Sequence, residues 1–99
     1  MRFDLLYYTP EARAQIETLE KDSAKVGVWK AVRKTLGLME TDLRHPSLHT
    51  HKYSALRGAG SEEVFEAYAQ NRTPGAFRVF WHYGPGKGRI TIVSVTPHP

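Results

Sequence analysis

The feature that most constrains this fold is a pair of strand-like segments joined by a glycine-rich turn. Residues 76–83, AFRVFWHY, alternate as a strand does, with Arg78, Phe80 and His82 on one face. The other face carries large apolar or aromatic side chains: Phe77, Val79, Trp81 and Tyr83. Residues 89–96, RITIVSVT, are rich in β-branched residues, and GPGKG at 84–88 is typical of a turn. The sequence therefore predicts an antiparallel hairpin here.

Two further segments extend this hairpin into a sheet. Residues 63–70, EVFEAYAQ, predict a strand that precedes it, followed by a turn at 71–75. Residues 3–8, FDLLYY, predict a first strand. Residues 45–61 show no sustained period and are predicted to form one long loop, a feature that is often functional in a small domain.

Two helices are predicted between the first strand and this loop. Thr9 stands at an N-cap and Pro10 at a first helical position, with an end near Lys21. Asp22 or Ser23 is predicted to cap the second helix. Apolar residues recur in it every three or four positions: Val28, Val32, Leu36, Met39 and Leu43. We expect an α+β fold of order β-α-α-β-β-β, with a helical hairpin on one face of a mainly antiparallel sheet, in one domain over residues 1–99.

Composition excludes several classes of site. The 99 residues include no cysteine, which excludes disulfides, thiolate metal sites and a cysteine nucleophile. No run approaches the ~18 apolar residues of a membrane span. The segment MRFDLLYYTP interrupts its apolar run with Asp4 and has no small-residue cleavage site, unlike a signal peptide. We therefore expect a cytoplasmic protein that has no membrane partner.

The positive charge is confined to the second part of the chain. Residues 1–43 hold seven basic and seven acidic residues, whereas residues 44–99 hold seven basic and three acidic ones. The net charge of +4 therefore lies after residue 43. A basic region attracts anionic partners such as nucleic acid, although ordinary surface charge is the simpler explanation of +4 alone.

Three segments in this basic part resemble the RelE/ParE toxin superfamily. Residues 56–58, Leu-Arg-Gly, match a Leu-basic-Gly motif that many members carry. Residues 75–81, GAFRVFW, are similar to the family's Gly-x-aromatic-Arg-aliphatic-x-aromatic strand. Residues 92–98, IVSVTPH, are similar to a final strand that runs into a catalytic Arg or His. The motifs cover about residues 56–98, and the order of predicted elements agrees over almost the whole chain.

The resemblance implies the toxin of a two-gene toxin–antitoxin pair. Several members of the superfamily are ribosome-dependent mRNA endonucleases that an antitoxin peptide holds inactive, and the ParE branch poisons DNA gyrase. The implied partners are a cognate antitoxin and mRNA, with or without the ribosome. Two alternatives stay open, a ParE-like gyrase inhibitor and a non-catalytic binding module of the same fold. The sequence leaves the oligomeric state open.

RNA cleavage without a metal needs a base for the 2′-hydroxyl, a cation for the phosphorane and an acid for the leaving 5′-oxygen. Arg78, from the family's central strand, is predicted to bind the scissile phosphate from an exposed sheet face. His98 aligns with the terminal catalytic residue and is predicted to be the acid, because an unperturbed histidine titrates near ~6.5. Glu66 is predicted to be the base, and a plain cross-strand ion pair with Arg78 is its alternative role.

Further contacts with RNA are predicted in the loop and on the face that carries Arg78. These residues are Lys52, His49, His51, Arg57, Phe80 and His82. Some ribosome-dependent members of the superfamily carry lysines in the strand equivalent to residues 63–70. That segment has no lysine here and contains Glu66, so a Glu/His/Arg mechanism is favoured.

A metal site is the rival interpretation of the histidines at 45, 49 and 51. A His-x-His spacing places two imidazoles on the same side of an extended segment. The loop that carries them, residues 45–61, contains no Asp, Glu or Cys, however. We therefore expect no metal and no other cofactor.

Overall fold

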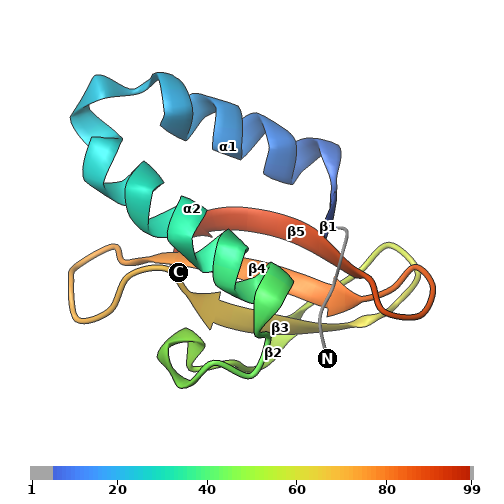
Figure 1. Ribbon diagram of the computed structural model, residues 1–99. Helices are drawn as coiled ribbons and strands as arrows, with labels where there is room; N and C mark the ends of the chain where they lie inside the picture. Colours follow the sequence, from blue (N-terminus) through green and yellow to red (C-terminus); the bar gives the residue numbers. More distant parts are fainter. Residues whose placement is uncertain (1–5, 99) are drawn as a thin grey trace.

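The computed structural model describes residues 6–98, which form a five-stranded sheet with two helices on one face (Figure 1). The helices are α1, Pro10–Lys21, and α2, Val26–Thr41. The strands are β1 (Leu6–Tyr8), β2 (His51–Arg57), β3 (Glu63–Tyr68), β4 (Phe77–Tyr83) and β5 (Ile90–Pro97). Their order across the sheet is β1-β5-β4-β3-β2.

The pairing of the strands confirms the predicted fold class. Neighbouring strands from β2 to β5 pair antiparallel, and β1 alone pairs parallel, with β5. The predicted hairpin is β4–β5, whose register joins Val79 to Val95 and Tyr83 to Ile90. The predicted first strand is present at 6–8, and its predicted residues 3–5 lie outside the described part of the chain.

Thr9 begins α1 as predicted and also ties this helix to the sheet. Its hydroxyl oxygen accepts a hydrogen bond from the Ala12 amide at 3.0 Å, which is the N-cap interaction. The same hydroxyl donates to the Val93 carbonyl at 2.7 Å. Pro10 occupies the first helical position, and the helix ends at Lys21, both as predicted.

The start of α2 differs from the prediction. Asp22 caps a short 3-10 turn, Ser23–Lys25, by accepting from the Ala24 amide at 2.9 Å. The predicted cap of α2 by Asp22 or Ser23 is therefore wrong, because this turn intervenes and α2 begins at Val26 without a side-chain cap.

The apolar stripe of the second helix is confirmed as part of the core. Three of its members on α2 are buried, and Val28 packs against them: Val32, Leu36 and Met39. Leu43 is also buried but lies beyond the end of α2 at Thr41, so the predicted helical stripe extends past the helix. The helix-side face of the sheet supplies the opposing side chains, chiefly Val79, Trp81, Ile90 and Ile92. The alternation predicted for residues 77–83 is therefore correct for this face of β4.

The predicted long loop at 45–61 is wrong over residues 51–57, which form the edge strand β2. Most β2 residues are exposed, and its pairing with β3 is irregular between Lys52 and Arg57. An edge strand of this kind has no buried alternating face, so it left no period in the sequence. A 3-10 turn, Pro46–Leu48, precedes it and buries Leu48 in the core.

No helix within residues 6–98 has the length and apolar character that a membrane crossing requires.

Candidate functional site

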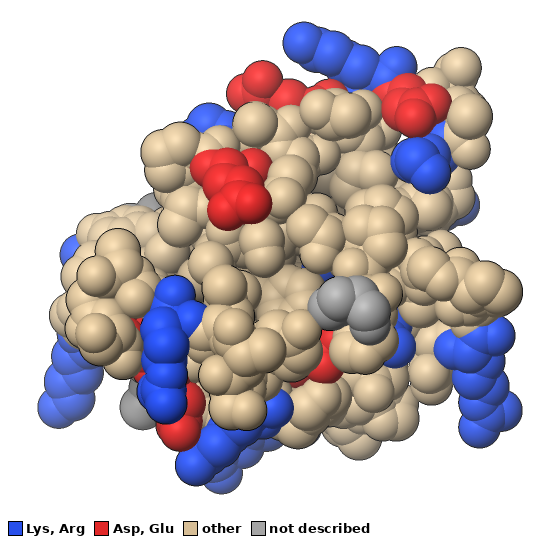
Figure 2. Space-filling view, turned by 180° about the vertical axis from the view of Figure 1, so that it is seen from behind, with Lys and Arg blue, Asp and Glu red and all other residues tan. Residues whose placement is uncertain are grey.

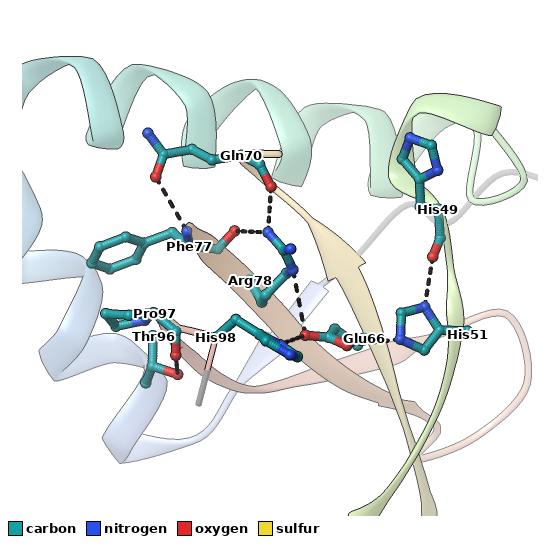
Figure 3. A network of polar contacts seen from close by, with 9 residues as sticks. All are labelled: His49, His51, Glu66, Gln70, Phe77, Arg78, Thr96, Pro97 and His98. Atoms are coloured by element: carbon teal, nitrogen blue, oxygen red, sulfur yellow. Dashed lines mark hydrogen bonds and ion pairs between the residues drawn. The ribbon is translucent and has the colours of Figure 1, made fainter. Parts of the chain in front are cut away.

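The carboxylate of Glu66 is the centre of a polar cluster on the sheet face that points away from the helices. Its oxygen Oε2 lies 2.5 Å from His98 Nδ1 and 3.4 Å from Arg78 Nε. Its other oxygen, Oε1, lies 2.8 Å from His51 Nε2. In Figure 3 the two histidines reach Glu66 from opposite sides, and Arg78 approaches it from above. We call Glu66, His51, Arg78 and His98 the Glu66 cluster.

Strand register brings the four residues together from distant parts of the sequence. His51 of β2 is directly opposite Glu66 of β3, and Arg78 of β4 is opposite Tyr68, two residues further along β3. His98 follows β5, and its amide donates to the Ala76 carbonyl at 2.8 Å. This bond continues the β4–β5 ladder, so the His98 backbone is fixed and its ring is directed at Glu66.

Arg78 is enclosed within the cluster. Its guanidinium lies 3.7 Å from the centre of the Tyr68 ring. Nη1 donates to the carbonyls of Gln70 and Phe77, and Nε pairs with Glu66. The predicted position on an exposed face is wrong, because only 7% of Arg78 is exposed. The alternative that the sequence left open, an ion pair with Glu66 across the strands, is present.

Exposure divides the cluster into an inner and an outer pair. The side chain of Glu66 is 1% exposed and that of Arg78 is 9% exposed. The side chains of His51 and His98 are 48% and 45% exposed. A ligand in solution therefore meets the two imidazoles first, and the buried carboxylate and guanidinium hold them from behind.

The predicted RNA contacts on β2 and in the turn before it separate into two groups. His49 lies near the cluster, because its ring is 5.0 Å from that of Tyr68 and its carbonyl is 2.9 Å from His51 Nδ1. Lys52 points to the other face of the strand by alternation and pairs with Glu63 at 3.3 Å. Arg57 lies at the far end of β2. The structure does not bring Lys52 or Arg57 to the cluster.

Phe80 and His82 do not lie on an open surface, which corrects the prediction. Phe80 is 3% exposed, and the Tyr53 ring covers it at a centroid distance of 4.8 Å. His82 is 7% exposed and lies under Gly58, where an added Cβ would stand 2.9 Å from His82 Cδ2. The glycine of the Leu-Arg-Gly motif thus permits a close approach of the β2–β3 turn to His82. Neither ring is placed to stack on a base.

Two titratable groups outside the cluster have displaced pKa values. Hydrogen bonds from its own amide and from the Gly60 amide lower the pKa of Glu62, and His82 contributes in the same direction. Burial raises the pKa of Tyr8, and the negative charge of Glu40 adds to this shift, while Arg13 opposes it.

A separate hollow of about 600 Å³ lies beyond the C-terminal end of α2. Its lining includes Arg44, His45, His49, Trp81 and Tyr83. The Trp81 indole N–H is buried without a hydrogen-bond partner. Within residues 6–98, no group of three or more His, Asp or Glu side chains is arranged to hold a metal ion.

The surface charge agrees with the distribution along the sequence. Figure 2 views the molecule from behind the sheet and shows Lys and Arg side chains around the lower part, where the strands lie. More of the visible acidic surface lies in the upper part, on the side of α1. On the face that Figure 2 shows, the part formed by the strands is therefore the more basic one and the more suitable for an anionic partner.

Known proteins resemble this chain in fold only. No protein-family model matches the sequence, and no curated protein matches it significantly. The fold is similar to a chain of the archaeal RelE–RelB complex from Pyrococcus horikoshii OT3, with a TM-score of 0.63 and 14% identity over 98% of this chain and 96% of that one. It is also similar to the YoeB/ParE toxin from Agrobacterium tumefaciens, with a TM-score of 0.62 and 12% identity over the whole of both chains. The chain therefore has a RelE/ParE-like toxin fold.

Proposed function

We propose that this chain, with its RelE/ParE-like fold, is the toxin of a toxin–antitoxin pair and cleaves mRNA without a metal ion. The observation that carries the proposal is the Glu66 cluster, in which two half-exposed histidines flank one buried carboxylate. The chain has the fold of toxins, and this cluster has the groups that RNA cleavage needs.

The proposed reaction is an internal transfer of the phosphoryl group. The 2′-oxygen forms a bond to phosphorus while the bond from phosphorus to the 5′-oxygen breaks. A base removes the proton of the 2′-hydroxyl, and an acid gives a proton to the departing 5′-oxygen. The products are a 2′,3′-cyclic phosphate and a 5′-hydroxyl. Imidazole suits both tasks, because its unperturbed pKa near ~6.5 allows either form at neutral pH.

Burial changes the roles predicted for two of the residues. Arg78 is held by Tyr68, Gln70 and Glu66, so we assign it as a positioning residue and not as a direct phosphate ligand. Its fixed charge still contributes a favourable potential for an approaching phosphate. Glu66 is buried between Arg78 and the two imidazoles and is assigned to orient them. His98 remains a residue that touches the substrate.

The proposed partners follow from the same likeness. One structural neighbour is a chain of a RelE–RelB complex, and we propose that a cognate antitoxin likewise binds this chain. The proposed substrate is mRNA, free or on the ribosome, and the proposed location is the cytoplasm. The more basic sheet side, which carries the cluster, is the expected RNA-binding side (Figure 2).

Induced expression in a bacterial host tests this function, with growth and mRNA integrity followed together. The wild type is compared with His98→Ala and with His45→Ala, a matched histidine that bonds to Ser47 and lies outside the cluster. Growth arrest with mRNA cleavage in the wild type and in His45→Ala, but not in His98→Ala, is the expected result.

Other outcomes separate the alternatives. Arrest with intact mRNA would contradict an endonuclease and favour a gyrase inhibitor, which a supercoiling assay then identifies. Normal growth at high levels of folded wild-type protein would contradict a toxin and leave a binding module.

A further inference from the structure

We infer that His51 is a second catalytic histidine and gives the proton to the leaving 5′-oxygen, while His98 removes the proton from the 2′-hydroxyl. This inference rests on the proposed RNA cleavage and reassigns the chemistry within the site. The sequence alone favoured Glu66 as base and His98 as acid.

Glu66 is badly placed to act as the base. Its side chain is almost completely buried, and each of its oxygens faces an imidazole nitrogen. A 2′-hydroxyl could reach the carboxylate only by displacing one of the rings. The two imidazoles are half exposed and reachable, so the acid and the base are best sought between them.

The contacts of His51 suit its ring to carry a proton. Nδ1 is hydrogen-bonded to the His49 carbonyl at 2.9 Å, and a carbonyl oxygen only accepts, so Nδ1 carries a hydrogen. Nε2 is 2.8 Å from the Glu66 carboxylate, which also only accepts when ionised. The negative charge of this carboxylate, so close to Nε2, stabilises a proton on the His51 ring. His51 is therefore the proton-bearing ring of the pair.

One of these two protons is available for transfer. Glu66 Oε1 is close to Nε2, but the contact is an ion pair without a hydrogen bond, and Oε1 has no hydrogen-bond partner within residues 6–98. The N–H at Nε2 is thus attracted to the carboxylate without being aligned with it. A leaving oxygen beside the exposed ring can take this proton at little cost in hydrogen bonding.

His98 has the complementary arrangement. Its Nδ1 is hydrogen-bonded to Glu66 Oε2 at 2.5 Å, and as the donor in this bond it leaves the lone pair on Nε2. No group in the described part of the chain bonds to Nε2. A carboxylate behind the ring stabilises the imidazolium that forms when Nε2 takes a proton. His98 is therefore suited to the base.

The placement of the rings suits the geometry of the reaction. The attacking and leaving oxygens lie on opposite sides of phosphorus in an in-line displacement. His51 and His98 contact opposite oxygens of one carboxylate and stand on opposite sides of it (Figure 3). One turnover leaves His98 with an added proton and His51 with one fewer, and exchange with water through the exposed rings restores both.

A substrate with a sulfur leaving atom tests the assignment. The probe is an oligoribonucleotide, free and on ribosomes, in which one 5′-bridging oxygen is replaced by sulfur. A thiol has a pKa near ~8.5, so a thiolate departs without a proton donor. His51→Ala is expected to lose about 10²–10⁴-fold in rate on the oxygen substrate and to recover most of it on the sulfur substrate. His98→Ala is expected to be equally impaired on both substrates.

The controls distinguish a failure of this assignment from a failure of the proposed function. His45→Ala is expected to match the wild type on both substrates. His51→Gln is a second, more conservative variant at the same position. Circular dichroism of both His51 variants checks that a loss of activity does not come from a loss of the fold. Wild-type rates for both His51 variants on the oxygen substrate, or rescue of His98→Ala in place of His51→Ala, would overturn the assignment. Losses in both variants without rescue of either would overturn His51 as the acid. A wild-type protein that cleaves neither substrate, free or on ribosomes, would instead refute the proposed function.

Discussion

The guanidinium of Arg78 lies 3.7 Å from the centre of the Tyr68 ring, on neighbouring strands whose register places the two residues directly opposite each other. The ring covers one side of a buried cation, and the Gln70 carbonyl and Glu66 bind its edge. Arg78 is therefore fixed at a point from which it holds the Glu66 carboxylate in place.

The aromatic face of Tyr68 should matter more than its hydroxyl group, which makes no hydrogen bond within residues 6–98. We expect Tyr68→Phe to change the free energy of unfolding by less than about 0.5 kcal/mol, because the cation–π contact is kept. Tyr68→Leu is expected to cost about 1–2 kcal/mol, because that contact is lost at a site shielded from water. Urea denaturation of both variants measures the difference, and equal costs would contradict this role of the ring.

The Glu66–Arg78 pair should be costly to break. Glu66→Gln keeps the shape of the side chain but leaves a buried guanidinium without its counter-charge, and we expect a loss of about 3–5 kcal/mol. The control is Glu63→Gln, three residues earlier on the same strand, where the exposed pair with Lys52 is worth about 0–1 kcal/mol. Similar urea midpoints for the two variants would show that burial of the pair does not matter.

Two glycine-to-alanine substitutions should change stability in opposite directions. At Gly37, in the interior of α2, a Cβ meets nothing within 4 Å, so Gly37→Ala is expected to stabilise by about 0.5–1 kcal/mol. At Gly58 the Cβ would stand 2.3 Å from Glu62 Oε1 and 2.9 Å from His82 Cδ2. Gly58→Ala is expected to cost about 1–3 kcal/mol, as overpacking does. Thermal denaturation of the two variants tests both expectations, and a stabilised Gly58→Ala would refute the close packing of this turn.

Stability at alkaline pH should depend on Tyr8. Burial, together with the charge of Glu40, raises its pKa in the folded state, so the unfolded chain loses this proton first as the pH rises. The contribution of Tyr8 is therefore complete below the ordinary tyrosine pKa near ~10 and is lost as the pH rises through the higher value of the folded state. We expect Tyr8→Phe to lose less stability than the wild type between pH 8 and pH 11 in urea titrations. Equal losses of stability in both proteins would contradict the raised pKa of Tyr8.

Local signals in the sequence were sufficient for the helices and the central hairpin. Thr9 and Pro10 mark a helix start through contacts within four residues, and the stripe from Val28 to Leu43 repeats with the helical period. Residues 77–83 place alternate, apolar side chains on the face of β4 that packs against the helices, as the alternation predicted. In each case the pattern of side chains that forms the element extends over only a few residues, so it can be recognised in the sequence.

The candidate site was only partly predictable, because long-range pairing creates it. Arg78 and His98 were found through motif positions, and Glu66 through the expected pairing of its strand with that of Arg78. The contact of His51 with Glu66 depends on β2, an edge strand without a period. The burial of Arg78 and Phe80 depends on Tyr68 and Tyr53, which cover them from neighbouring strands. Alternation indicates which face a residue occupies, but not what covers that face.

Thr9 and Val93, which are joined through the Thr9 hydroxyl, stand 84 positions apart in the sequence. The pairing of β1 with β5 therefore closes a loop that contains most of the chain, whereas β2 to β5 are joined by short connections. Closing a long loop slows folding, so the attachment of β1 and α1 to the sheet is expected to be the slow step of folding. In native-state hydrogen exchange, the amides of β1 should open more readily than those of β3 and β4. The buried pair of the Glu66 cluster, Glu66 and Arg78, lies on the strands that stay closed, and the side of the molecule that carries β1 is where transient opening is expected to concentrate.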